Sequence, residues 1–365
     1  VENIGIILMG VGVGMIGMAT HHPLLAALGL LGGLYHLLNH ALFKGLLFLG
    51  AGAVISRLHS KDMEKMGGLA RRMPYTALVF LVGCMAISAL PPLNGFVSEW
   101  FTYQSLFTLS HQGGFGLRLI APIAIVMLAI TGALAAMCFV KVYGISFCGA
   151  PRSEKAAQVT EVPWPMTAAM AVLALLCVLL GVGASVVAPV ITQVAVSLTG
   201  DAAPVVAHGL TLFPGNPVQT TLSTPLIFIL LLALPVLPLL LYVAGKGGRL
   251  TFRQQGAPWA CGYDYEPAMA ASAASFTQPL RVLFAPLYRI RKTLAPAPML
   301  QSTLERSTEA ARRIEPLLDD HVVLPLAGGI QKVSRGMQWI QHGDFRLYCL
   351  YVVAALVILL LVTMA

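Results

Sequence analysis

Long apolar stretches separated by short polar ones dominate the order of residues along this chain. Several of these stretches reach the roughly 20 residues that an α-helix needs to cross a lipid bilayer. The pattern predicts an all-α polytopic membrane protein with about seven transmembrane helices. The predicted spans cover residues 3–20, 24–56, 75–109, 118–148, 163–186, 224–245 and 346–365.

The third predicted span is interrupted by the run Pro91-Pro92-Leu93-Asn94-Gly95. Proline removes backbone hydrogen-bond donors and an Asn-Gly pair favours a turn, so the run leaves backbone groups unpaired at membrane depth. Such backbone is tolerated only in a protein interior or beside a cavity, and half-helix ends that face an ion path recur in transporters. We therefore predict a functional broken helix at 91–95, formed by Pro91, Pro92, Asn94 and Gly95.

Residues 246–345 follow a different pattern, with charged residues every few positions and no apolar span. Within 280–292, apolar residues recur at helical spacing and basic residues occupy other faces, which predicts an amphipathic helix along the membrane surface. Residues 304–318 predict a solvated or interfacial helix, or alternatively a strut that contacts a neighbouring subunit. The predicted organisation is a transmembrane domain at 1–245, a cytoplasmic-side amphipathic region at 246–345 and a final transmembrane helix at 346–365.

Composition supports a membrane protein and narrows its chemistry. The chain is 57% hydrophobic and only 10% charged, and its mean hydropathy is +0.80. Its six cysteines are scattered singly, with no C-x-x-C pair and no histidine spaced to complete a metal site. No glycine-rich phosphate loop occurs. We therefore expect no metal or cofactor in this chain, so any redox chemistry belongs to partner subunits.

The net charge of +8 has a topological explanation. Basic residues concentrate in 57–74, 149–162 and 246–346, and the last of these segments holds thirteen of the 23. The loops that alternate with them contain no Lys or Arg, so the positive-inside rule predicts that the basic loops are cytoplasmic. Basic and aromatic residues are not interleaved as a nucleic-acid-binding surface would need, which excludes nucleic acid as a partner.

Glu99 is the only carboxylate within any predicted span, and it closely follows the helix break. Burying an ionised side chain in hydrocarbon costs about 2.5 to 3.5 kcal/mol on insertion scales, so acids persist there where a water-filled path or a partner charge receives them. His36, His40 and Lys44 recur every four residues, which places them in one polar stripe on a helix. An acid, a base and two imidazoles in one membrane domain indicate proton movement.

These residues suggest a proton half-channel. We hypothesise that Lys44 stores a proton, that His36 and His40 link it through water, and that Glu99 exchanges protons with one membrane face. Lys44 lies near mid-membrane, roughly 18 Å along a helix axis from Arg57, which is too deep for simple snorkelling to the interface. Lys141 is a further candidate for the path, but its place in the last third of its span leaves snorkelling equally open.

Three motifs, in this order, resemble those of the antiporter-like membrane subunits, which include the proton-pumping subunits of respiratory complex I and the Mrp-type sodium/proton antiporters. The motifs are His36 to Gly52, the run Met66-Gly-Gly-Leu, and Ser88 to Glu99. Three C-terminal stretches resemble the branch attached to membrane-bound [NiFe] hydrogenases and formate hydrogenlyase. They are Trp259-Ala-Cys-Gly-Tyr, Gln278-Pro-Leu-Arg-Val and Gly343-Asp-Phe-Arg-Leu-Tyr-Cys-Leu-Tyr.

The resemblance implies roles for the same residues. Lys44 would be the central lysine of a long helix, His36 and His40 its connecting histidines, and Glu99 the terminal titratable group of a broken helix. Residues 273–340 would correspond to a lateral amphipathic helix. The resemblance also implies that this chain matches only the C-terminal half of the family, and the start at Val1, with no charged segment before the first span, leads us to expect a longer protein.

The resulting expectation is a multi-pass subunit of the bacterial inner membrane that translocates protons for a hydrogenase or formate hydrogenlyase complex. Nickel–iron and iron–sulfur centres would lie in its partner subunits, which carry out the electron transfer. Two alternatives remain open at this point: an autonomous sodium/proton antiporter, and a membrane scaffold that does not transport ions. Assembly with a redox arm distinguishes the first expectation from the antiporter.

Overall fold

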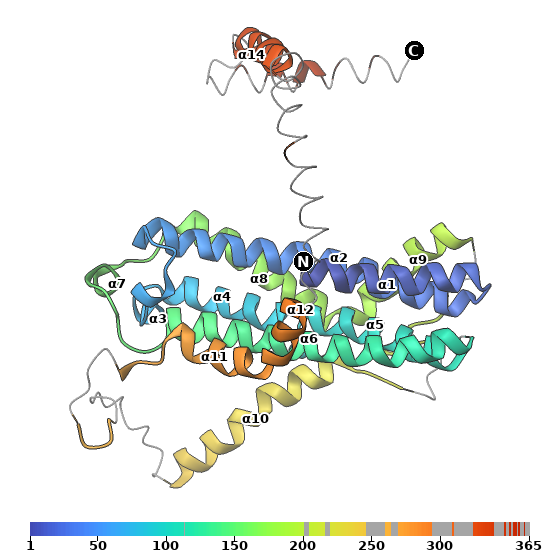
Figure 1. The fold of residues 1–365 in the computed structure, drawn as a ribbon, viewed down its shortest axis with the longest axis horizontal. Coiled ribbons are helices and arrows are strands. Elements are labelled where there is room, and N and C mark those ends of the chain that lie inside the picture. The colour runs from blue at the N-terminus through green and yellow to red at the C-terminus, as the bar shows by residue number, and fades with distance from the viewer. Residues whose placement is uncertain are drawn as a thin grey trace. The chain divides into compact units, whose positions relative to one another are not determined.

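The computed structural model describes most of the chain in two compact units, Val1–Arg281 and Val282–Ala365. The described residues are 1–112, 114–200, 204–215, 220–245, 260–263, 269–293, 309, 324–338, 347, 350, 351, 353–355, 357 and 361. The first unit contains a bundle of long helices (Figure 1). Its helices are α1 (Glu2–Ala19), α2 (Pro23–Leu58), α3 (Leu69–Arg72), α4 (Pro74–Ile87), α5 (Asn94–Gln112), α6 (Phe115–Phe147), α7 (Glu154–Gln158), α8 (Trp164–Val182), α9 (Ala184–Thr199), α10 (Thr224–Gly245) and, at its end, α11 (Ala273–Leu283).

The all-α membrane fold predicted from the apolar pattern is confirmed. Within the described residues, five helices are long and apolar enough to cross a membrane: α1, α2, α6, α8 and α10. Each coincides with a predicted span, and α4 and α5 together form the predicted broken one. The span expected at 346–365 lies largely outside the described residues.

The chain between the fifth and sixth predicted spans differs from our expectation, because residues 187–199 are helical and not part of a loop. They belong to α9, which is shorter than a full membrane span. Ala184, Ala188, Thr192 and Ala195 recur at helical spacing and are buried, and α9 packs against α2. Small residues at this spacing allow close helix contact, a signal that hydropathy alone does not report.

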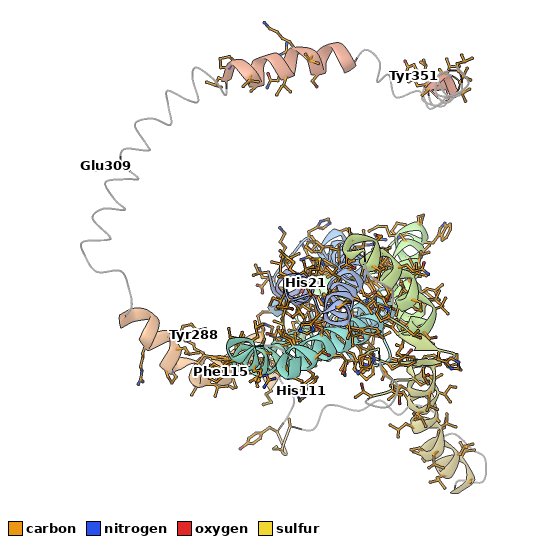
Figure 2. The ribbon with its side chains drawn as sticks, turned by 90° about the vertical axis from the view of Figure 1, so that its right-hand side faces the viewer. His21, His111, Phe115, Tyr288, Glu309 and Tyr351 are labelled. Atoms are coloured by element: carbon orange, nitrogen blue, oxygen red, sulfur yellow. The ribbon has the colours of Figure 1, made fainter. Side chains whose placement is uncertain are left out.

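Helix α2 is the centre of the bundle and contacts α1, α4, α5, α8 and α9. Glycines bring α1 and α2 close together: a Cβ added to Gly10 would lie 2.6 Å from the backbone nitrogen of Gly33, and one added to Gly17 would overlap the backbone of Ala26. Small residues at a membrane helix interface let backbones approach and gain van der Waals contact. The bundle is seen nearly end-on in Figure 2, with His21 at the α1–α2 turn.

Two helix interruptions meet beside α2. The first separates α4 from α5 and contains a cis peptide bond between Pro91 and Pro92. The second separates α8 from α9 at Gly183. Gly181 lies so close to the first break that a Cβ there would overlap the Pro92 carbonyl. The tertiary structure therefore places the predicted break inside the protein, packed against a second one.

A short hairpin, β1 (Ala207–His208) with β2 (Thr211–Leu212), follows α9. In the predicted amphipathic region, residues 280–292 fall in α11 and α12 (Ala285–Thr293). Apart from position 309, the predicted helix at 304–318 lies outside the described residues. Within the second unit the structure also describes α14 (Leu324–Gln338).

Candidate functional site

The imidazole of His36 connects three helices of the bundle. His36 lies on α2 and its side chain is 1% exposed. Its Nδ1 atom lies 3.0 Å from Oγ of Ser98 on α5, and its Nε2 atom lies 3.1 Å from Oδ1 of Asn3 on α1. A buried, fully hydrogen-bonded histidine that bridges three helices can both hold the helices together and exchange a proton.

A second α2 side chain holds the helix break. The side-chain nitrogen of Asn39 donates to the Asn94 carbonyl at 2.8 Å, and Oδ1 of Asn94 accepts from the Gly95 amide at 3.0 Å. These bonds satisfy part of the backbone that the break leaves unpaired. Oδ1 of Asn39 and Nδ2 of Asn94 are buried without a hydrogen-bond partner in the described part of the chain. The break is therefore a polar point inside an apolar bundle.

Glu99 lies one residue after Ser98 on α5 and is 7% exposed. A Cβ added to Gly132 of α6 would lie 4.0 Å from its Oε2 atom, so the carboxylate faces α6 at a residue without a side chain. Its charge also interacts with that of Glu2 on α1. Across the described ranges, no hydrogen bond or ion pair involves the Glu99 carboxylate. The acid is thus buried and faces the small space that Gly132 leaves open.

His40 and Lys44 lie progressively nearer the surface of the chain than His36. His40 is half-buried, and its ring centroid lies 5.6 Å from that of Phe43. Lys44 is exposed, and its Nζ atom lies 5.6 Å from the centre of the Phe48 ring. Four residues turn an α-helix by about 40° more than a full circle, so a stripe at this spacing rotates from the interior to the surface.

Lys141 lies on α6 and is half-buried, and in the part of the chain that the structure describes it forms no hydrogen bond or ion pair with His36 or Glu99. It is nine residues beyond Gly132, which corresponds to roughly 13 Å along the helix. The structure therefore links His36 to Ser98, the residue directly before Glu99 on α5, while His40 and Lys141 are half-buried and Lys44 is exposed.

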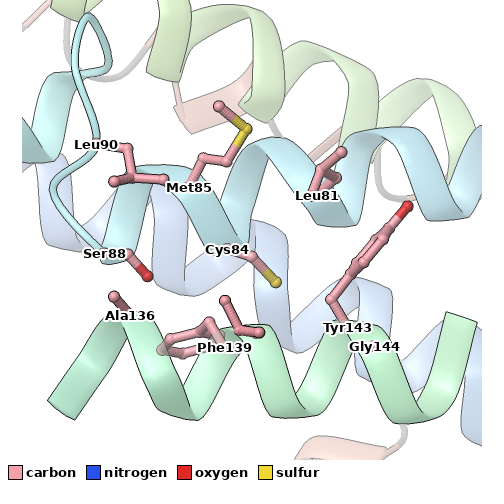
Figure 3. Close-up of a pocket in the computed structure, with 10 residues that line it drawn as sticks. Leu81, Cys84, Met85, Ser88, Leu90, Ala136, Phe139, Tyr143 and Gly144 are labelled. Carbon is pink, nitrogen blue, oxygen red and sulfur yellow. The ribbon is translucent and has the colours of Figure 1, made fainter. Parts of the chain in front are cut away.

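A cavity of about 270 Å³ lies between α4 and α6 beside the break (Figure 3). Ser88 at the end of α4, Cys84 and Tyr143 supply its few polar atoms, and the rest of its lining is apolar. Among the described residues, no group of three or more His, Cys, Asp or Glu side chains is placed to hold a metal ion.

Sequence reasoning missed four residues around this site: Glu2, Asn3, Asn39 and Ser98. Glu2 lies just outside the first predicted span, and the other three carry no charge. Asn39 follows His36 by three residues, so its position on the same side of the helix was a usable signal. Asn3 and Ser98 offered no local signal, because their partner His36 lies 33 and 62 residues away in the sequence.

Comparisons with known proteins agree with the fold and cover the site. Residues 4–141 match the family described as NADH:quinone oxidoreductase/Mrp antiporter, TM. The chain is 55% identical over 361 residues to hydrogenase-4 component B of Escherichia coli (strain K12), covering 99% of this chain and 54% of that protein. It is 48% identical over 299 residues to formate hydrogenlyase subunit 3 of the same organism, covering 82% of this chain and 46% of that protein.

The chain spans about half the length of these curated relatives. Among solved structures, a chain of the membrane-bound sulfane sulfur reductase, an archaeal respiratory membrane complex, has a TM-score of 0.59. The match covers 98% of this chain and 56% of that one at 20% sequence identity, which is a likeness of fold.

Proposed function

Residues 4–141 belong to the NADH:quinone oxidoreductase/Mrp antiporter transmembrane family, and from this premise we propose that the chain translocates protons as part of a membrane subunit of a [NiFe]-hydrogenase or formate hydrogenlyase complex. The high identity to two such subunits over most of the chain supports the type of complex. The buried residues Ser98 and Glu99, which closely follow the helix break in sequence, and His36, which bonds to Ser98, support the proton as the transported ion. In this proposal the nickel–iron and iron–sulfur centres belong to partner subunits.

The helix break carries the mechanistic argument. An ionisable residue inside a membrane domain is a functional-site candidate because its burial is costly. Here the carboxylic acid lies on α5, directly after the serine that bonds to the imidazole of His36, and two amide atoms of Asn39 and Asn94 are buried without partners in the described part of the chain. In this proposal each amide atom bonds to water, with Oδ1 of Asn39 accepting and Nδ2 of Asn94 donating a hydrogen bond. Protons would pass between Glu99 and His36 through these groups.

Lys44 would receive or release protons at the end of this path that reaches the surface of the described bundle. It lies on an exposed face of α2 together with Leu37, Leu38 and Phe48. A lysine surrounded by exposed apolar side chains at mid-helix is unfavourable next to lipid. We propose that other helices of the complete subunit or of a neighbouring subunit cover this face and complete the path beyond Lys44.

We place the basic loops on the cytoplasmic side of the bacterial inner membrane. Two of them lie at one end of the bundle, where Arg152 forms an ion pair with Glu64 at 2.8 Å and Arg57 donates to the Glu161 carbonyl at 2.6 Å. The labels of α3 and α7 mark this end in Figure 1. Basic loops gathered at one end support this orientation under the positive-inside rule.

The test is proton movement linked to hydrogenase turnover in inverted membrane vesicles that carry the complete complex. We expect Glu99→Gln to abolish proton movement while hydrogenase turnover continues, because the amide keeps the shape of the side chain but cannot release a proton. Glu154→Gln is the matched control, since Glu154 is an exposed carboxylate on the short loop helix α7. Unchanged proton movement in Glu99→Gln at equal assembly would contradict the proposal and favour a scaffold.

The family also includes sodium/proton antiporters, so the same vesicles should be tested for sodium. A subunit of a hydrogenase complex co-purifies with a redox arm and moves protons only during its turnover. An autonomous antiporter exchanges sodium for protons without that arm. Sodium-dependent proton exchange in vesicles that lack hydrogenase activity would therefore establish the antiporter alternative.

A further inference from the structure

The hydrogen bonds of His36 determine which of its ring nitrogens can change protonation. Nε2 faces Oδ1 of Asn3 at 3.1 Å. A carboxamide oxygen only accepts hydrogen bonds, so Nε2 must carry a hydrogen to form this bond. The neutral imidazole is therefore the Nε2–H tautomer, and a second proton is gained or lost at Nδ1, on the side of Ser98.

Ser98 can satisfy Nδ1 in both protonation states. Its Oγ lies 3.0 Å from Nδ1, 3.0 Å from the Gly95 carbonyl and 3.2 Å from the Asn94 carbonyl. A hydroxyl group has one hydrogen to donate and two lone pairs to accept with. With neutral His36, the hydroxyl donates to Nδ1. With protonated His36, Nδ1–H donates to Oγ, and the hydroxyl turns to donate to a carbonyl of the first turn of α5.

We propose that Ser98 is a positioning residue for His36, whose hydroxyl hydrogen switches between His36 and the carbonyls at the start of α5 each time the imidazole gains or loses a proton. The switch leaves no group without a partner in either state. Because the receiving carbonyls belong to the first turn after the break, the protonation of an α2 side chain changes the hydrogen bonding of α5. The consequence for transport rests on the proposed function, whereas the hydrogen-bond switch itself does not.

The first experiment measures the tautomer by ¹⁵N NMR of the complete protein labelled at histidine. The chain contains nine histidines, and the His36 signals are those that disappear in His36→Gln. At about pH 8, where an ordinary imidazole is neutral, we expect a protonated Nε2 and an unprotonated, hydrogen-bonded Nδ1. Ser98→Ala should shift the Nδ1 resonance, and in Ser98→Thr the resonance should lie close to its wild-type position. A neutral Nδ1–H tautomer, or an Nδ1 signal unaffected by Ser98→Ala, would overturn the proposal.

The second experiment compares proton translocation in vesicles with equal amounts of assembled complex. We expect Ser98→Ala to slow translocation about tenfold, the size of losing one hydrogen bond to a charged group, and Ser98→Thr to recover most of the rate. Ser105→Ala is the matched control. Ser105 is also fully buried on α5 and donates to the Thr102 carbonyl at 2.8 Å, but bonds to no imidazole among the described residues. Equal rates for Ser98→Ala and Ser98→Thr would overturn the transport role.

The two experiments separate this inference from the proposed function. The predicted tautomer together with unchanged translocation in Glu99→Gln would refute the proposed function and leave the switch intact. Translocation that is lost in Glu99→Gln but unaffected by Ser98→Ala would refute the role of the switch in transport and leave the proposed function intact.

Discussion

Gly132 of α6 lies against the Glu99 carboxylate. A Cβ at this position would lie 4.0 Å from Oε2, which is an ordinary contact distance. We therefore predict that Gly132→Ala leaves proton translocation nearly unchanged. Gly132→Leu should reduce it strongly, because a branched side chain would displace the carboxylate or exclude water from it. Proton translocation of both variants is measured in inverted vesicles. Equal rates of translocation in Gly132→Ala and Gly132→Leu would contradict this account of the site.

The three regularly spaced residues of α2 illustrate the limit of sequence reasoning at the residue scale. Their spacing predicts one polar stripe on one face of the helix, but the structure buries His36 and leaves Lys44 exposed. The difference arises from the rotation of about 40° for every four residues and from the position of the neighbouring helices. Which end of a stripe is buried depends on packing, which the sequence of α2 does not contain.

At the scale of helices, close contact between α1 and α2 supports the position of Asn3 relative to His36. We predict that Gly17→Ala destabilises the protein by about 1 to 3 kcal/mol, the usual cost of overpacking, because its Cβ would overlap the backbone of Ala26. Gly12→Ala is the control on the same helix. No atom of the described residues lies within 4 Å of a Cβ at Gly12, and alanine favours a helix over glycine by about 1 kcal/mol.

Unfolding of the detergent-solubilised protein measures the effect of the two alanine substitutions. The Gly17→Ala variant should unfold at a lower temperature than the wild type, and the Gly12→Ala variant at the same or a higher temperature. A Gly17→Ala variant as stable as Gly12→Ala would show that α1 and α2 do not approach as closely as described.

The paired interruptions also belong to the helix scale. The break at 91–95 was predictable because proline and Asn-Gly act on their own backbone. The second break at Gly183 and the helix α9 were not predicted, since no proline run marks them. They form because Gly181 and the small residues of α9 fit against the first break and α2, respectively.

Across the whole first unit, one ion pair connects distant parts of the chain at the basic end of the bundle. Arg152 pairs with Glu64 at 2.8 Å and donates to the Ala271 carbonyl at 2.6 Å, while Glu64 accepts from the Ala273 amide at 2.6 Å. We predict that Arg152→Gln loosens the start of α11. Amide hydrogen exchange in α11 should become about fivefold faster, equivalent to roughly 1 kcal/mol.

Lys155→Gln provides the control for charge, because Lys155 lies on the same loop and is exposed. The amide exchange rates of α11 in the Lys155→Gln variant should match those of the wild type. If the two variants behave alike, the effect of Arg152→Gln comes from net charge and not from the connection through Glu64.

The sequence by itself determined the membrane class, six of the expected spans, the helix break and the polar residues beside it. These features depend on local properties: the hydropathy of about 20 consecutive residues and the backbone chemistry of proline, asparagine and glycine. The motifs that resemble a known family lie in the same stretches, and the comparisons confirm that family.

Only the tertiary structure decided that His36 bridges Asn3 and Ser98, that Asn39 holds the break, and that Lys44 lies on an exposed face. The physical reason is that hydrogen bonds between helices depend on which helix faces meet, and residues 33 to 62 positions apart form them here. Neutral polar residues give no charge signal in an apolar helix. They become recognisable as parts of a site when packing places a histidine within hydrogen-bonding distance.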